Sequence, residues 1–394
     1  MRRRQLRALT GVRFFAAAHV VVYHYGRGLV KLPGAVARIL DHGFAGVTLF
    51  FVLSGFILAY NHAGDGAAPA TGAPPAARDF WAARFARIYP VYVLGLLLAL
   101  PALIWPAHGA SASSGRDLVL AVTTTPLLLQ GWIPRIAGRW NGPAWSLSAE
   151  ALFYAAFPLL ALGIVRLRRR GLLLLALGAF AASLAIAGAY LWIRPDGVVW
   201  AGIETAKAPW LAHVRYHPLA RVPEFVLGIA AGRLFLLRGT SLGRRRLWDW
   251  AAIAAVLATL AVAASPVTPP FPMVHVGLLA PAFALAIYGL AAAGERGLLS
   301  RALSTEAAVR LGEASYALYI LHVPVHDLLT RLLVATRWQP PATVFFAAYL
   351  ATAVVASLVV NRGFEVPMRR IVRGWVGRSP ARVGEEVPAA AQAA

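Results

Sequence analysis

The chain has 394 residues, of which 59% are hydrophobic and 14% are charged, and it contains no cysteine. This composition excludes a soluble enzyme, and the lack of cysteine excludes disulfides, thiolate nucleophiles and cysteine-ligated metals. A formal net charge of +22 would indicate a nucleic-acid partner in a soluble protein. Here the basic residues gather in short tracts between apolar segments, as in cytoplasmic loops, so we expect no nucleic-acid partner.

Apolar stretches of about 20 residues recur along the chain, and each is long enough to cross the hydrocarbon core as a helix. The predicted fold is therefore an all-α, polytopic helical membrane bundle. We expect about ten spans, near residues 8–26, 44–60, 81–103, 146–164, 171–192, 221–237, 248–264, 273–293, 313–332 and 342–364.

An eleventh apolar stretch, residues 118–130, has only 13 residues and contains a proline. If it does not span, basic tracts such as "RLRRR" at 166–170 all fall on the cytoplasmic side. We therefore expect a re-entrant or surface helix there and both termini in the cytoplasm. The same reading gives an inner linker at 65–78, a transmembrane domain at 1–370, and a basic and then disordered cytoplasmic tail at 371–394.

The first predicted span contains ionisable residues, which are costly in hydrocarbon. Arg13 and His24 are 11 positions apart, so they share one helix face and lie about 16 Å apart along the axis. Arg13 belongs to the inner half and His24 to the outer end. His19 lies on a different face. We interpret Arg13 and His24 as catalytic residues; the alternative for His24 is an ordinary interfacial histidine.

The segment "NGPAWSLSAEALFY" at 141–154 begins the fourth predicted span from the outside. Ser146, Glu150 and Tyr154 follow at intervals of four and share a face. We expect Glu150 to lie level with His24 and to orient it for general-base catalysis. The alternative is a pairing of Glu150 with a basic residue such as Arg221.

Two further motifs indicate binding groups. Arg84 and Arg87 are about one turn apart at the inner start of the third span, and suit a phosphate-bearing ligand, although they could be topological anchors. Tyr319 and His322 share a face near mid-membrane, where we expect a cavity wall. The Ser54-Gly55 pair could supply a nucleophile, but we interpret it as a site of close helix packing. We expect no metal site.

Together these motifs resemble the acyltransferase-3 family of bacterial membrane O-acyltransferases. The resemblance covers roughly residues 6–370, and the motifs occur in the family's order. It rests on the Arg13–His24 spacing, the "FFVLSGF" helix, the paired arginines of "RFARIYP", the "WSL" to "FY" segment and the "SYALYILHVP" helix.

The resemblance implies transfer of an acyl group, most often acetyl, from cytoplasmic acyl-CoA to a hydroxyl of a cell-surface or secreted glycan, or of a macrolide. It implies a multi-pass protein of the bacterial inner membrane with no tightly bound cofactor. Arg13, Arg84 and Arg87 would hold the CoA phosphates, Ser146, Tyr319 and His322 would bind substrate, and His24 with Glu150 would meet the acceptor. A proton-coupled transporter is the alternative from another class, since buried Arg, His and Glu also suit a translocation path.

Overall fold

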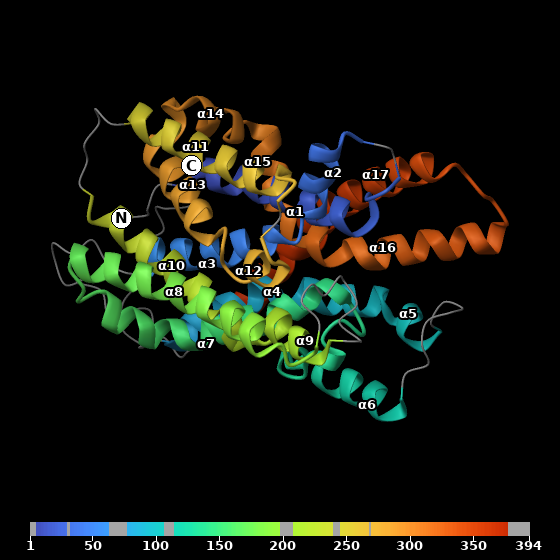
Figure 1. The fold of residues 1–394 in the computed structure, drawn as a ribbon. Helices are drawn as coiled ribbons and strands as arrows, with labels where there is room; N and C mark the ends of the chain where they lie inside the picture. The colour runs from blue at the N-terminus through green and yellow to red at the C-terminus, as the bar shows by residue number, and fades with distance from the viewer. Residues whose placement is uncertain are drawn as a thin grey trace, which may run out of the picture.

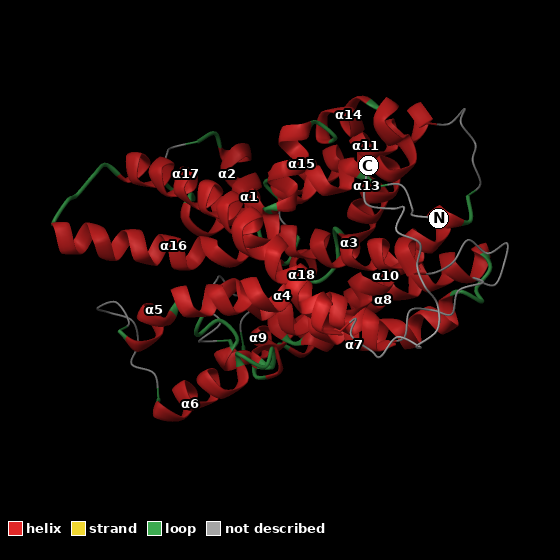
Figure 2. Cartoon of the chain, turned by 180° about the vertical axis from the view of Figure 1, so that it is seen from behind, coloured by secondary structure: helices red, strands yellow, loops and turns green. Residues whose placement is uncertain are grey.

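The computed structural model describes residues 5–29, 32–62, 77–105, 114–197, 208–238, 245–267 and 269–376. Within these ranges every regular element is helical and no strand occurs (Figure 2). The long helices run side by side along one common direction (Figure 1). The expected all-α helical membrane bundle is confirmed.

Eight helical segments of the described residues are long and apolar enough to cross a membrane. They are α3 (Ala45–His62), α4 (Ala77–Leu98), Gly142–Ile164 with α7 (Trp145–Ile164), α8 (Arg169–Ile193), α11 (Arg245–Ala264), Phe271–Arg296, α16 (Ser315–Thr336) and Ala342–Val372 with α17 (Ala342–Val360). The other two expected spans form α1 (Arg7–Tyr25) and α10 (Pro218–Leu236), of 19 residues each. These two helices carry ionisable residues in their interiors, which lowers their hydropathy; the total of ten spans remains a prediction.

Shorter helices connect the long ones, and α6 (Gly115–Thr124) is the one that bears on topology. With 10 residues it is about 15 Å long, half the thickness of the hydrocarbon core. The chain then continues in short turns to the start of α7, so residues 118–130 do not form a spanning helix. The remaining short elements are α2 (Gly34–Asp41), α5 (Leu100–Ile104), α9 (Pro209–Tyr216), α14 (Leu298–Leu303), α15 (Glu306–Glu313), α18 (Val366–Val376), and the turns Gln130–Trp132, Pro134–Ile136, Gly142–Ala144 and Gly294–Arg296.

The span expected at 273–293 is not one continuous helix. It consists of α12 (Phe271–His275) and α13 (Ala280–Ala293), and the break contains Gly277 with φ of +94°. This left-handed conformation favours glycine because it has no Cβ. The break leaves the carbonyl of His275 outside the helical hydrogen-bond ladder, where it accepts from Arg221.

The last span continues beyond its expected end. A π-helical turn at Asn361–Glu365 joins α17 to α18, and α18 runs to Val376, past the domain end expected at 370. Most of the predicted linker at 65–78 and the end of the tail, from 377, lie outside the described residues.

Glycines allow α3 and α10 to cross at backbone contact. A Cβ on Gly55 would collide with the carbonyl oxygen of Phe225, and one on Gly228 with that of Val52. Close approach of helix backbones at small residues is a common packing mode in membranes. The interpretation as a packing site is confirmed for Gly55, whereas its neighbour Ser54 lines a cavity within the bundle.

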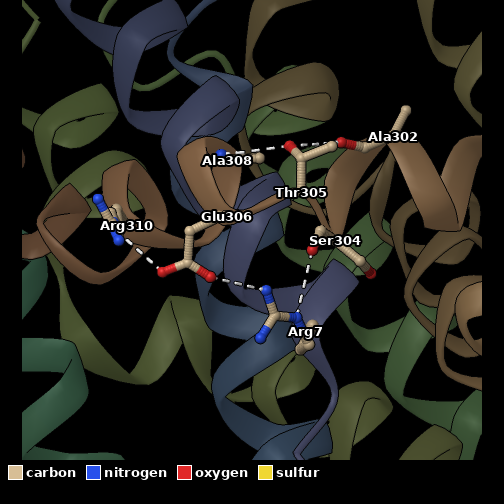
Figure 3. A network of polar contacts seen from close by, with 7 residues as sticks. All are labelled: Arg7, Ala302, Ser304, Thr305, Glu306, Ala308 and Arg310. Carbon is tan, nitrogen blue, oxygen red and sulfur yellow. Dashed lines mark hydrogen bonds and ion pairs between the residues drawn. The ribbon is translucent and has the colours of Figure 1, made fainter.

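A polar network ties the start of α1 to the segment that joins α14 and α15 (Figure 3). Arg7 donates to the carbonyl of Ser304 at 3.2 Å and to Glu306 at 3.1 Å, and Glu306 also accepts from Arg310 at 2.9 Å. The network places α14 and α15 at the same end of the bundle as the beginning of α1, as the ten-span topology requires.

Candidate functional site

Two cavities lie along the bundle, on either side of Tyr319. The inner cavity, of about 380 Å³, reaches from the start of α1 at Gln5 to Ser146 on α7. The outer cavity, of about 400 Å³, lies between the C-terminal end of α1 and the turns that precede α7. The names inner and outer follow the expected topology. Both volumes are in the range of small-molecule sites.

Arginines from two helices meet in the inner cavity. Arg13 on α1 and Arg84 and Arg87 on α4 line it, together with Glu150 and Tyr154 on α7. The Tyr154 hydroxyl donates to Glu150 at 2.7 Å. Three guanidinium groups against one carboxylate give a net positive cavity, which suits a phosphate-bearing ligand.

The outer cavity is lined by His24 from α1 and by Arg139, Arg215, Trp145 and His275 from elements that follow much later in the chain. His24 is exposed to this space. His19 lines neither cavity; its Nε2 lies 2.8 Å from the carbonyl oxygen of Ile39 on α2, so it joins two helices. The expected difference between the faces of these two histidines is confirmed.

Tyr319 and Val47 line both cavities and form the wall between them. The Tyr319 hydroxyl lies 2.9 Å from the Pro143 carbonyl oxygen and 2.9 Å from Ser146 Oγ. Two neighbours therefore fix the position of this phenol. Ser146 and Tyr319, both expected at a binding site, lie where the two cavities adjoin.

The hydrogen bonds of two histidines determine which ring nitrogen of His24 carries the proton. His322 Nδ1 lies 2.7 Å from the Tyr319 carbonyl oxygen, which can only accept, so His322 is protonated at Nδ1 and its Nε2 has a lone pair. His24 Nδ1 faces both that lone pair, at 3.3 Å, and the Val20 carbonyl oxygen, at 2.9 Å. His24 Nδ1 must therefore be the donor, which leaves His24 Nε2 as an unprotonated base in the neutral ring.

The expected pairing of Glu150 with His24 is wrong. Glu150 lies in the inner cavity, where it accepts from Tyr154, whereas His24 lies in the outer cavity. Nor does Glu150 pair with Arg221, which is bound to Glu224 at 3.0 Å. Glu150 lies about one turn from the start of α7, as expected, but this part of α7 is level with Arg13 in the inner cavity and not with His24.

The expectation that His322 forms a cavity wall is also wrong. His322 is fully buried and lines neither of the two cavities. The hydrogen bond to the Tyr319 carbonyl holds its ring against α1, so it lies behind His24 and contacts that residue instead of substrate.

A buried ionic cluster behind the outer cavity was not identified from the sequence. Arg221 on α10 contacts Glu224 at 3.0 Å, Thr48 Oγ1 at 3.1 Å and His275 Nδ1 at 3.2 Å. Arg221 and Glu224 are both fully buried. The sequence feature that could have identified this pair is the spacing of three residues between Arg221 and Glu224 within an apolar span, since buried charges in membrane helices usually pair with one another.

No group of three or more His, Cys, Asp or Glu side chains within the described residues is close enough together to hold a metal ion.

Comparison with known proteins agrees with the motifs. Residues 6–362 match the model of an acyltransferase domain. The chain is 31% identical to "Acyltransferase MdmB" of Streptomyces mycarofaciens over 403 aligned positions, which cover 98% of this chain and 97% of that protein. No solved structure matches. The chain is therefore an acyltransferase and belongs to the acyltransferase-3 family of bacterial integral-membrane O-acyltransferases.

Proposed function

We propose that this protein transfers an acyl group, most often acetyl, from cytoplasmic acyl-CoA to a hydroxyl of a cell-surface or secreted glycan, at the bacterial inner membrane. Membership of an acyltransferase family favours the enzyme over the transporter alternative. The identities of the acyl donor and of the acceptor are what we propose beyond family membership.

The observation that carries the proposal is the pair of adjoining cavities with different chemistry. The inner cavity presents Arg13, Arg84 and Arg87 at the end of the bundle expected in the cytoplasm, where acyl-CoA is available. The outer cavity presents the unprotonated Nε2 of His24. Along α1 these two groups are separated by about 16 Å, a distance that an extended pantetheine arm can bridge.

In this proposal, the arginines hold the CoA phosphates and the thioester reaches past Tyr319 toward His24. His24 Nε2 takes the proton of the acceptor hydroxyl while the hydroxyl oxygen attacks the thioester carbonyl. Collapse of the tetrahedral intermediate breaks the carbon–sulfur bond, and the CoA sulfur takes the proton back from His24. The products are the ester and free CoA, and no tightly bound cofactor is needed.

Purified protein in lipid vesicles provides the test. With labelled acetyl-CoA and a glycan acceptor, label should appear in the glycan and depend on His24. Transfer to a macrolide and to no glycan would replace the proposed acceptor with a small secondary metabolite. Absence of transfer from acetyl-CoA and from longer acyl-CoA thioesters to any acceptor would overturn the donor assignment.

A further inference from the structure

The outer cavity carries positive charge that no acidic side chain offsets. None of the residues that line it is an aspartate or glutamate, among the parts of the chain that the structure describes. Of its three arginines, Arg135 is paired with Asp117 at 3.1 Å. Arg139 and Arg215 have no such partner among the described residues.

Arg215 is the more deeply placed of the two. Its side chain on α9 is 92% buried, and its guanidinium lies over the rings of Tyr216 and Phe271, at 4.9 and 5.3 Å. Nε and Nη1 have no hydrogen-bond partner among the described residues, and the same holds for Nη2 of Arg139. Buried, unpaired guanidinium groups are costly unless a ligand supplies the missing acceptors.

His275 adds a donor of the same kind. Its Nδ1 faces Arg221 Nη1 at 3.2 Å, and a guanidinium can only donate, so the ring proton of neutral His275 is on Nε2. The cavity therefore offers donors from Arg139, Arg215 and His275, while His24 Nε2 is a base that takes a proton. A matching ligand has anionic oxygens that accept from these three donors, and beside them a hydroxyl that gives its proton to His24.

We infer that the acceptor is an acidic sugar, whose carboxylate or phosphate binds Arg215 and Arg139 while its hydroxyl meets His24. The inference rests on the proposed function, because it names the class of glycan that the outer cavity takes. An anionic group also fixes the sugar's orientation, since a guanidinium binds carboxylate or phosphate in a defined two-pronged geometry.

Binding without any acyl donor tests the inference separately from catalysis. Methyl glucuronoside, methyl glucoside and methyl glucoside 6-phosphate share one ring and differ at carbon 6. Titrated into the full-length protein in detergent micelles, the glucuronoside or the phosphate should bind at least about tenfold more tightly than the glucoside. The tighter of the two identifies the anionic group.

The preference for the acidic glycosides over the neutral glucoside should fall about tenfold in Arg215→Gln and in Arg139→Gln. It should partly recover in Arg215→Lys. Arg116→Gln is the matched control, because it removes one exposed positive charge from α6 and leaves the lining of the cavity unchanged. Equal binding of all three glycosides, or an equal loss in Arg116→Gln, would overturn the inference. If Arg215→Gln does not fold, binding to Arg139→Gln and to Arg215→Lys decides whether the inference holds.

Catalysis supplies the second readout. Anion binding that depends on Arg215, without transfer to any glycoside, would contradict the proposed function and leave the anion site standing. If transfer to the neutral glucoside is as efficient as transfer to both acidic glycosides, the acidic-sugar inference is overturned and the proposed function stands.

Discussion

His24 and His19 lie on one helix and differ in what they face. His24 Nε2 faces the outer cavity, whereas His19 is bonded to the carbonyl of Ile39. His24→Ala should reduce acyl transfer by about 10²–10⁴-fold, the usual cost of losing a general base. His19→Gln is the control, since its amide can keep the bond to Ile39, and it should retain most activity. Initial rates at equal amounts of folded protein check this, and an equal loss in both variants would remove His24 from its assigned role.

If His24 is the general base, as we propose, its active form is the neutral ring, and the transfer rate should rise with pH along a single ascending limb in the range where imidazole loses its proton. His24 then has Nε2 free to take the hydroxyl proton. A rate profile over pH measured at saturating donor and acceptor checks this. A descending limb over the same range would mean that the charged ring is the active form.

We expect His322 to act through His24 as a positioning residue. Its Nε2 lies 3.3 Å from His24 Nδ1 and, together with the Val20 carbonyl oxygen at 2.9 Å, favours the tautomer that leaves His24 Nε2 unprotonated. His322→Leu removes one of the two acceptors of His24 Nδ1 and should lower kcat by up to about tenfold, with little change in the KM for acyl-CoA. His322→Gln retains an acceptor oxygen and should recover part of the rate. A rise in KM with unchanged kcat would indicate a binding role instead.

At the scale of helices, the crossing of α3 and α10 depends on glycine. A methyl group at Gly228 would collide with the carbonyl of Val52, whereas one at Gly178 on α8 would meet open space. Both Gly→Ala changes favour helix formation by a similar amount. Gly228→Ala should nevertheless destabilise the fold by about 1–3 kcal/mol through overpacking, and Gly178→Ala should not. Thermal unfolding in detergent compares the two; equal melting temperatures would show that the crossing can open without cost.

The inner end of α4 supplies two of the three arginines of the inner cavity. Arg84→Ala combined with Arg87→Ala should raise the KM for acyl-CoA by tenfold or more, because charge-assisted bonds to phosphate are lost. Arg245→Ala with Arg246→Ala at the inner start of α11 removes the same charge from outside this cavity. Similar effects of the two double changes would reduce Arg84 and Arg87 to topological anchors.

At the scale of the whole molecule, the ten-span topology can be tested cleanly because the chain contains no cysteine. Arg169→Cys at the start of α8 should be inaccessible to an impermeant maleimide in intact spheroplasts and become reactive after permeabilisation. Arg116→Cys on α6 should react without permeabilisation, since α6 is too short to span and the expected topology places it on the outer side. Labelling of Arg169→Cys from outside would require a different number of spans.

The sequence by itself determined the fold class and supplied the candidate groups for the chemistry. Hydropathy predicted most of the helices, because the bilayer permits few spanning structures, and the basic tracts give their expected orientation. The spacing of Arg13 and His24 gave their common orientation toward the interior, since a continuous helix fixes that relation.

Tertiary structure alone decided which of these groups meet. The relative depth of α1 and α7 separated Glu150 from His24, and the packing of α16 against α1 made His322 the partner of that histidine. The break at Gly277 brought His275 to Arg221, and α9 brought Arg215 to the outer cavity. Periodicity within one helix specifies a face, but the depth and neighbours of that face depend on contacts between helices far apart in the sequence.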